Sequence, residues 1–266
     1  MRRTAFALAF TALIAAFAPA QAQDSQSSPA APGGQSLGQA ASDPTASLMS
    51  FQINDWYTAK FHGLDDETAN QLVFRAVIPF STGGFDHIFR ATVPFITDHP
   101  VADSGLSDST IFDLVVFDED WGRWGVGAVA LLPTGGEASG AEKWGLGPAL
   151  GFTVRSPGLL WGVFNQNVFT VAGDDDREDV NISIFQPILS HRLGAGWSVG
   201  VSDMNLTYDW EGGRFSSLPL GAKVSKLLRL AGSPVQFSAQ YEHDFADDEI
   251  GPADTFRFTI KFLVPK

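Results

Sequence analysis

The 266-residue sequence has no cysteine, three methionines and an excess of acidic over basic side chains. Without cysteine, a disulfide scaffold, a thiolate metal site and a thiol nucleophile are all excluded. The formal net charge is −13, which argues against nucleic acid as a partner. Long hydrophobic runs are also missing. After residue 50 the longest apolar stretch, Gly125 to Pro133, has about nine residues, fewer than the roughly 20 that a transmembrane helix needs.

The N-terminus has the three parts of a secretory signal peptide. Arg2 and Arg3 form the positive region, Thr4 to Ala18 is an almost unbroken apolar stretch, and Ala20-Gln21-Ala22 is an A-x-A cleavage site. The apolar stretch is short for a membrane span and has no stop-transfer flank. We therefore predict that residues 1–22 are a signal peptide, cleaved before Gln23.

Composition predicts that residues 23–50 are a periplasmic leader. The stretch from Asp24 to Ser42 is rich in Ser, Ala, Gly, Pro and Gln, so it cannot bury enough apolar surface to order itself and is expected to be flexible. Asp43 followed by Pro44 is a typical helix start, with an N-cap residue and proline at the first helical position. One short turn of helix is expected over residues 46–49.

From residue 51 onward, hydrophobicity alternates with period two. Apolar residues at 256, 258, 260 and 262, for example, alternate with polar residues at 255, 257, 259 and 261. Segments with one apolar face and one polar or glycine face are what the strands of a membrane-spanning barrel require. Residues 51–266 are therefore predicted to be all-β, a closed transmembrane antiparallel β-barrel of about 12 strands in the outer membrane.

The predicted strands are 51–61, 70–80, 86–97, 108–118, 122–133, 143–154, 158–170, 179–190, 195–210, 216–228, 234–244 and 254–264. The ninth is long, and a bulge is expected near Asp203-Met204-Asn205. Long and short connections alternate, as they do between the extracellular and periplasmic ends of outer-membrane barrels. Tryptophans at 121, 124, 161 and 197 mark the short-turn end and those at 144 and 210 the opposite end, where aromatic girdles belong, whereas Trp56 does not fit this pattern.

A series of short motifs runs through the chain in a fixed order. They are Asp43-Pro44-Thr45-Ala46-Ser47-Leu48, Phe51-Gln52-Ile53-Asn54, Val77-Ile78-Pro79-Phe80, Arg90-Ala91-Thr92-Val93-Pro94, Gly105-Leu106-Ser107-Asp108, Trp124-Gly125-Val126-Gly127, Leu132-Pro133-Thr134, Lys143-Trp144-Gly145-Leu146-Gly147-Pro148, Ala172-Gly173-Asp174, Val180-Asn181, Gln186-Pro187, Tyr208-Asp209-Trp210, Pro219-Leu220-Gly221, Phe256-Arg257-Phe258-Thr259 and Phe262-Leu263-Val264-Pro265-Lys266. Each motif is weak alone, but their shared order is specific.

This series resembles a family of bacterial outer-membrane barrel proteins, usually labelled transporter or, misleadingly, neuromedin U. That family is related to the barrel family associated with meta-cleavage phenol degradation. The resemblance covers about residues 43 to 266. It implies a barrel and a transport role, and it carries over no catalytic residues. Two departures, Val264 in place of Phe and Phe51 in place of a proline-containing junction, leave the implied fold unchanged.

Extending each strand's alternation inward predicts which charged side chains line the lumen. The basic ones are Lys60, Arg75, Arg90, Arg123, Lys143, Lys223, Arg257 and Lys261, and the acidic ones are Asp113 and Glu242. The long connections carry mostly Asp and Glu, so a basic lumen is expected beneath an acidic rim. Rings of Arg and Lys favour anions in pores, and a 12-stranded barrel is narrow. The alternative is that these bases form ion pairs and simply pack the lumen.

No cofactor and no catalytic site are predicted. The five histidines are scattered without zinc-ligand spacing. The one adjacent Ser-His pair, Ser190 and His191, is predicted on opposite faces of a strand. An acidic run supplies a candidate divalent-ion loop with Asp174, Asp175, Asp176 and Glu178, but its spacing is not that of an EF-hand, so a solvated loop is the preferred interpretation.

Three functions remain open at this point. The first is a narrow channel or transporter for small anionic or aromatic solutes. The second is a structural or adhesive barrel whose lumen is plugged by its own side chains or by the leader, and the third, least favoured, is a barrel enzyme acting on lipid. The expected partners are outer-membrane lipid, lipopolysaccharide, a small-molecule solute and the barrel-assembly machinery during insertion, with no nucleic acid.

Overall fold

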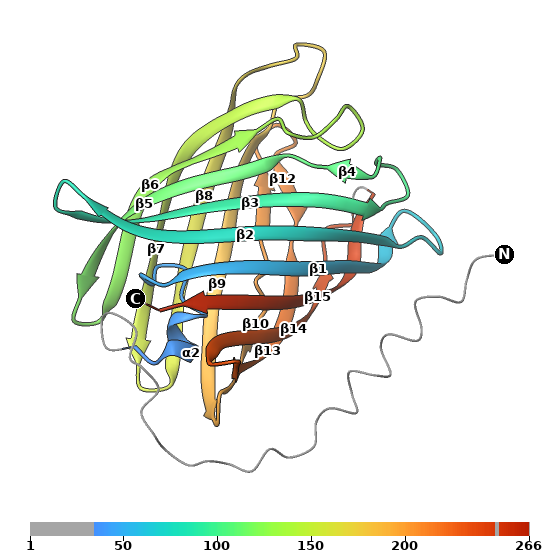
Figure 1. Ribbon diagram of the computed structural model, residues 1–266. Coiled ribbons are helices and arrows are strands. Elements are labelled where there is room, and N and C mark those ends of the chain that lie inside the picture. The colour runs from blue at the N-terminus through green and yellow to red at the C-terminus, as the bar shows by residue number, and fades with distance from the viewer. Residues whose placement is uncertain (1–34, 248–249, 266) are drawn as a thin grey trace.

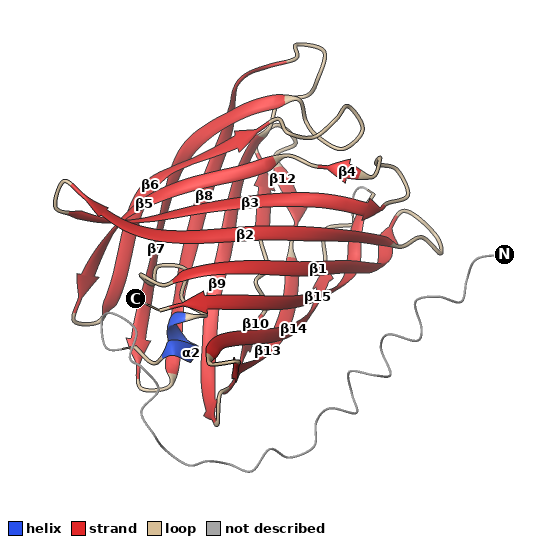
Figure 2. Cartoon of the chain, in the orientation of Figure 1, coloured by secondary structure: helices blue, strands red, loops and turns tan. Residues whose placement is uncertain are grey.

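The computed structural model describes residues 35–247 and 250–265, which form a closed barrel of antiparallel strands with one short helix (Figures 1 and 2). The strands are β1 (Met49–His62), β2 (Ala69–Thr82), β3 (Phe85–Asp98), β4 (Gly105–Leu106), β5 (Ser109–Glu119), β6 (Gly122–Leu132), β7 (Lys143–Ser156), β8 (Leu159–Gly173), β9 (Asn181–Gly194), β10 (Trp197–Val201), β11 (Leu206–Asp209), β12 (Arg214–Ser217), β13 (Pro219–Leu230), β14 (Ser233–Asp244) and β15 (Gly251–Val264). The barrel closes where β15 pairs with β1, with Met49 opposite Val264.

Twelve strands make the wall of the barrel, which confirms the predicted fold class. β10 and β11 are two parts of one wall strand, and so are β12 and β13, whereas the two-residue β4 lies in a loop and pairs with β3. The predicted strand 195–210 is interrupted at residues 202–205, where the sequence predicts a bulge. Alternation of polarity therefore located nearly every wall strand.

The two ends of the barrel differ in their connections. Two-residue turns at 83–84, 120–121, 157–158, 195–196 and 231–232 close one end, called the short-turn end below. In the first of these turns Gly83 and Gly84 have φ of +59° and +84°, which glycine adopts without strain and which suits a tight hairpin. The connections at the loop end are longer, up to the segment 99–108 that contains β4. β1 begins and β15 ends at the short-turn end.

The outer surface of the barrel is apolar between two aromatic levels. On β15 the side chains of Phe256, Phe258, Ile260 and Phe262 are exposed, whereas the intervening Thr259 is buried. The exposed tryptophans are Trp121, Trp124 and Trp161 at the short-turn end and Trp144 and Trp210 at the loop end. An apolar belt between aromatic girdles is the surface of a barrel that is surrounded by lipid.

One side of the lumen is filled by an apolar core. Buried side chains from β3 to β8 pack against one another inside the barrel, with Ile88, Phe112, Leu114, Val129 and Phe164 among them. Close packing on this side leaves the polar cavities to the inner faces of β1–β3, β9, β10 and β12–β15. The open part of the lumen is therefore smaller than the space that the barrel wall encloses.

The N-terminal segment lies inside the short-turn end of the barrel, which corrects part of the leader prediction. The helix is α2 (Leu37–Ala40), capped by Ser36, rather than a turn beginning at Asp43 and Pro44. The flexibility predicted for residues 24–42 does not hold for 35–42, because Leu37 and Ala40 are buried against apolar side chains of the barrel. The predicted signal peptide and residues 23–34 lie outside the described residues.

Among the residues that the structure describes, no helix has the length and hydropathy to cross a membrane.

Candidate functional site

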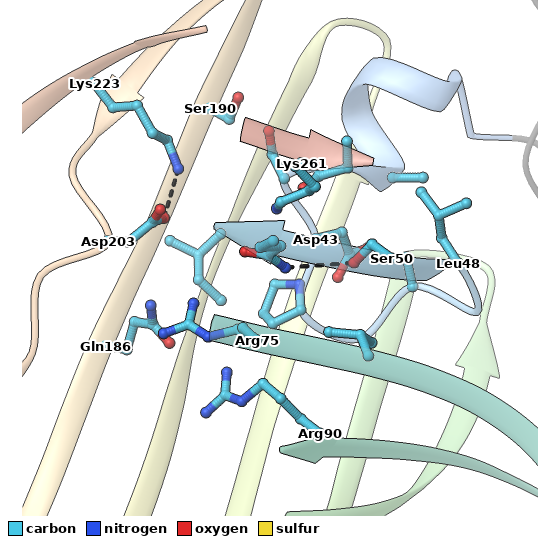
Figure 3. A pocket seen from close by; sticks show the side chains of 18 of the residues that line it. Asp43, Leu48, Ser50, Arg75, Arg90, Gln186, Ser190, Asp203, Lys223 and Lys261 are labelled. Atoms are coloured by element: carbon cyan, nitrogen blue, oxygen red, sulfur yellow. Dashed lines mark hydrogen bonds and ion pairs between the residues drawn. The ribbon is translucent and has the colours of Figure 1, made fainter. Parts of the chain in front are cut away.

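A chamber lies in the lumen between the N-terminal segment and the inner faces of β1, β2, β3, β13 and β15. Four basic side chains line it, Arg75, Arg90, Lys223 and Lys261, and Figure 3 shows the two arginines extending into it from neighbouring strands. Its water-accessible volume is ≈ 80 Å³. That is room for about five waters or a small anion. We call this cavity the inner chamber.

The basic side chains of the inner chamber outnumber the carboxylates that compensate them. Lys223 Nζ lies 2.5 Å from Asp203 Oδ1, and Lys261 Nζ donates to the carbonyl of Ala41 at 2.7 Å. In the described part of the chain, Arg75 and Arg90 have no ion pair with a carboxylate. Buried positive charge without a paired carboxylate attracts anions strongly.

The two arginines differ in how they are held. The Arg90 guanidinium lies 3.9 Å from the Phe112 ring centroid and donates to Gln166 Oε1 at 3.4 Å. The Nε of Arg75 is buried without a hydrogen-bond partner. A buried donor without a partner is costly, and an anion in the chamber would satisfy it. Arg75 is therefore the best-placed group to bind an anion in this chamber.

A second cavity, called the outer vestibule below, lies toward the loop end and has a water-accessible volume of ≈ 290 Å³. Arg257 lies at its base, paired with Glu242 at 2.6 Å, and its guanidinium carbon is 4.2 Å from the Trp56 ring centroid. The same guanidinium donates to the carbonyl of Asp203, a residue of the inner chamber, at 2.9 Å. Arg257 therefore stands between the two cavities, and its cation–π contact explains why Trp56 lies outside both girdles.

Asp43 lines the inner chamber and anchors the N-terminal segment. Its fully buried carboxylate pairs with Arg155 at 3.0 Å and accepts from Gln35 Nε2 at 2.8 Å. It also accepts from the amide and hydroxyl of Thr45, at 2.8 and 2.6 Å, and from the Thr153 hydroxyl at 3.3 Å. Because Thr153 and Arg155 lie on β7, this network ties residues 35–45 to the barrel wall.

Arg123 is a second anchor of the same segment. Its guanidinium donates to the Thr45 carbonyl at 2.6 Å and the Ser47 hydroxyl at 2.9 Å, while Asp118 holds it by two hydrogen bonds. Gln39, in α2, donates to carbonyls at both ends of the β7–β8 turn, at 3.1 and 3.0 Å. These contacts seat residues 35–48 as a plug at the short-turn end, and we use that name for them below.

The lumen residues predicted from the sequence fall into four groups. Arg75, Arg90, Lys223 and Lys261 line the inner chamber, and Arg257 and Glu242 lie at the base of the outer vestibule. Arg123 and Lys143 also have buried side chains, but they lie at opposite ends: Arg123 contacts the plug, and Lys143 pairs with Asp179 of a loop at 3.0 Å. Lys60 and Asp113 are not in the lumen.

Lys60 points outward because a bulge follows Thr58. The register with β15 shifts on both sides of Lys60, so the side chain lies opposite the outward-facing Asp254, at 3.6 Å, and is 74% exposed. A one-residue irregularity moves every following side chain to the other face of a strand. The inward prediction for Lys60 is therefore wrong.

Asp113 points outward because its strand turns its apolar face to the lumen. Its neighbours Phe112 and Leu114 belong to the apolar core inside the barrel, so Asp113 lies on the outer face, where it contacts His87 Nδ1 at 2.8 Å. The sequence rule of apolar outside and polar inside fails where the lumen itself is filled by apolar side chains. The inward prediction for Asp113 is therefore wrong as well.

Two important lumen carboxylates were missed. Asp203 lies in the segment where the sequence predicts a bulge, which hides its inward orientation from a period-two pattern. Asp43 lies in the stretch read as a helix start, and its only sequence signal was its place in the first motif of the family resemblance. Both residues act through tertiary contacts that alternation does not report.

The candidate sites at the surface are not assembled in the described residues. Asp174, Asp175, Asp176 and Glu178 are exposed, and no group of three or more His, Asp or Glu side chains in the described part of the chain is placed to hold a metal ion. Ser190 is buried whereas His191 is exposed, as expected for neighbours on opposite faces. Their orientation does not favour a catalytic pair.

Comparison with known proteins supports the fold. No protein-family model and no curated protein matches the chain in sequence. Among solved structures, the COG4313 outer membrane channel from Pseudomonas putida F1 superposes with a TM-score of 0.59 at 14% identity, over 83% of this chain and 97% of that chain. The KdgM porin in complex with disordered oligogalacturonate gives 0.49 at 9% identity, over 80% and 98%. Outer membrane phospholipase A from Escherichia coli gives 0.42 at 9%, over 82% and 92%.

At these identities the likeness shows a shared outer-membrane barrel fold, and it does not confirm the more specific neuromedin U resemblance.

Proposed function

We propose that this protein is a narrow outer-membrane channel for small organic anions, closed at its periplasmic end by the plug. The observation that carries the proposal is the inner chamber, a cavity lined by two arginines, two lysines and two carboxylates. Of the carboxylates, Asp43 is already paired with Arg155 outside this set, which leaves Asp203 alone to pair with one of the four bases, Lys223. Low-dielectric walls strengthen the field of these charges, and basic linings favour anions in pores. The exposed apolar belt contacts outer-membrane lipid and, at the loop end, lipopolysaccharide in this proposal.

Anions would enter from the loop end and meet Arg257 first. The outer vestibule offers this guanidinium beside the Trp56 ring, a pairing that suits an aromatic or aliphatic carboxylate. Passage into the inner chamber requires the contacts of Arg257 with Glu242 and Asp203 to exchange for contacts with the solute. The plug must then leave its seat, because residues 40–48 line the chamber on its periplasmic side.

Ion selectivity of the channel tests this proposal. The refolded mature chain, and a form that lacks residues 35–48, are placed in planar bilayers under a KCl gradient. We expect small conductance with the plug, larger conductance without it, and a reversal potential of anion selectivity. The double substitution Arg75→Gln and Arg90→Gln should move the reversal potential toward zero, whereas Lys60→Gln, which changes an outward-facing charge, should leave it unchanged. Cation selectivity of the intact chain would contradict the proposal.

A second function is favoured by the apolar core of the lumen. Because side chains from β3 to β8 fill one side of the barrel, a non-conducting structural or adhesive barrel is consistent with the same structure. Absence of conductance both with and without residues 35–48 would favour this alternative.

A further inference from the structure

A cluster of polar side chains lies on the outer surface of the barrel, on β8 and β9. Asn165 and Asn167 occupy outward positions of β8, and Ser183 lies opposite Asn167 on β9. The Asn167 amide donates to Asn165 Oδ1 at 2.8 Å, and its oxygen accepts from the Ser183 hydroxyl at 2.6 Å. The indole of Trp210 donates to the same hydroxyl at 2.9 Å. Polar side chains are costly toward lipid and favour contact with other protein groups, so this face differs from one that meets lipid alone.

The polar and small character of this face continues as far as β5. The carbonyl of Pro148 on β7 accepts from Asn167 at 3.4 Å, and Pro148 lies opposite Ala128 of β6, which lies opposite Asp113 of β5. On the inside of the barrel the same strands carry the apolar core, so this part of the wall has the reverse of the usual polarity. We use the name polar strip for the outward positions Asp113, Ala128, Pro148, Asn165 and Asn167.

The polar strip lies near the middle of the apolar belt. Ala128 is four residues from Trp124 on β6, and Asn165 is four residues from Trp161 on β8. Both tryptophans belong to the girdle at the short-turn end. With the usual tilt of barrel strands, four residues correspond to about 10 Å of depth in an apolar band that is about 25 Å tall. Ala128 and Asn165 therefore share one depth, and Asp113, opposite Ala128, lies within about one residue of it.

Two groups of the polar strip have hydrogen-bonding capacity left over. His87 contacts Asp113 Oδ2 at 2.8 Å, whereas Asp113 Oδ1 has no partner and the side chain is 42% exposed. The amide of Asn165 donates one hydrogen to the Ile184 carbonyl at 3.1 Å, and its second hydrogen has no partner in the described part of the chain. One group is an acceptor and the other a donor, but three strand spacings, about 14 Å, separate them within one barrel.

We propose that the polar strip is the interface of a homodimer, in which a second copy of this chain packs against the outer faces of β5–β8. The two-fold axis runs along the membrane normal between β6 and β7, where the short side chains of Ala128 and Pro148 allow the two walls to approach closely. Asp113 and Asn165 lie at similar depth on either side of this axis. The rotation therefore brings Asp113 of each protomer toward Asn165 of the other.

The occupant is a second copy because the polar strip complements its own two-fold image. An isologous interface requires a surface whose donors and acceptors exchange under the rotation, and the acceptor on β5 and the donor on β8 do so. Lipid chains supply neither a donor nor an acceptor at this depth. A polar group that is left without a partner there is costly, so the dimer satisfies groups that the single barrel does not.

Disulfide cross-linking tests the dimer, because the chain has no cysteine of its own. Ala128→Cys places a thiol beside the axis and near its symmetry mate, whereas Ile260→Cys places one in the apolar belt of β15, on the opposite side of the barrel. Both mature chains are refolded into phospholipid vesicles at a low protein-to-lipid ratio and oxidised with copper phenanthroline. We expect a yield of linked dimer that is several-fold higher for Ala128→Cys. Equal yields would overturn the interface, and Pro148→Cys, across the axis, replaces Ala128→Cys if that variant does not fold.

The contact between Asp113 and Asn165 is tested in the Ala128→Cys background. Asp113→Leu and Asn165→Leu each remove one partner of both symmetry-related contacts and should lower the dimer yield several-fold. Asp55→Leu is the matched control, because it removes an outward carboxylate of β1 that already accepts from Asn70 at 2.5 Å, and it should leave the yield unchanged. A dimer yield that neither Asp113→Leu nor Asn165→Leu lowers would overturn the assigned contact.

Discussion

The buried carboxylate of Asp43 is predicted to control how often the channel opens. Asp43→Asn keeps the size of the side chain but removes its charge, and it turns an amide donor toward groups that are themselves donors. Breaking a buried ion pair costs about 3–5 kcal/mol when the partner is left alone. Here Arg155 retains Asp118 at 3.4 Å and is partly exposed, so the cost to plug seating is about 2–3 kcal/mol.

The cost to plug seating sets how much the fraction of open channels increases. A loss of about 2–3 kcal/mol shifts the equilibrium between seated and released plug by about 30- to 150-fold. Single-channel recordings of Asp43→Asn in planar bilayers should therefore show an open probability that is higher by tens of fold, at unchanged unitary conductance. The open pore is the same in both proteins, because residue 43 leaves the chamber with the plug and the barrel wall is not altered.

A matched control separates plug release from a general change in charge. Asp120→Asn removes the same charge from an exposed position in a turn at the short-turn end, and should leave the open probability unchanged. If Asp43→Asn folds as a barrel and its open probability equals that of the unchanged chain, the anchoring role of this carboxylate is refuted. If both variants open more often, surface charge rather than the buried network is responsible.

Three further outcomes follow from the inner and outer faces of the wall. Arg123→Ala, which removes the donors to the plug at Thr45 and Ser47, should raise the open probability in the same recordings as Asp43→Asn. Phe258→Arg places a charge in the apolar belt and should lower the free energy of unfolding by about 2–4 kcal/mol in urea titrations with lipid vesicles, whereas Phe258→Leu should cost under about 1.5 kcal/mol. Asp113→Leu should leave that free energy unchanged or raise it by about 1 kcal/mol, since the carboxylate faces outward; a loss larger than this would show that its contact with His87 stabilises the barrel.

The sequence by itself determined the class of fold. A strand of a barrel has lipid on one side, so every second side chain is selected for apolar character, and that alternation is a local property that a sequence records directly. Turn glycines such as Gly83 and Gly84 mark strand ends for an equally local reason. The strand count, the location of the short turns and the bulge near Asp203 could therefore be predicted without tertiary information.

The orientation of particular charges was decided by tertiary structure. Alternation gives the relative side of neighbours but not which side is the lumen, and each bulge inverts the pattern beyond it. Lys60 was misplaced by such a bulge, and Asp113 by a lumen that is apolar along β3 to β8. The ion pairing of the lumen was equally hidden from the sequence. Asp203 pairs with Lys223, and Arg75, on a strand distant in the sequence, keeps a buried Nε without a partner.

The plug was also decided by the tertiary structure alone. Residues 35–48 have too little apolar surface to fold on their own, and composition correctly reports that weakness. Inside the barrel, however, Leu37 gains a ready-made apolar surface and Asp43 gains the guanidinium of Arg155. Order in such a segment is supplied by the cavity that receives it. Because the energy that orders this segment comes from contacts with the barrel, its composition does not predict that it is ordered.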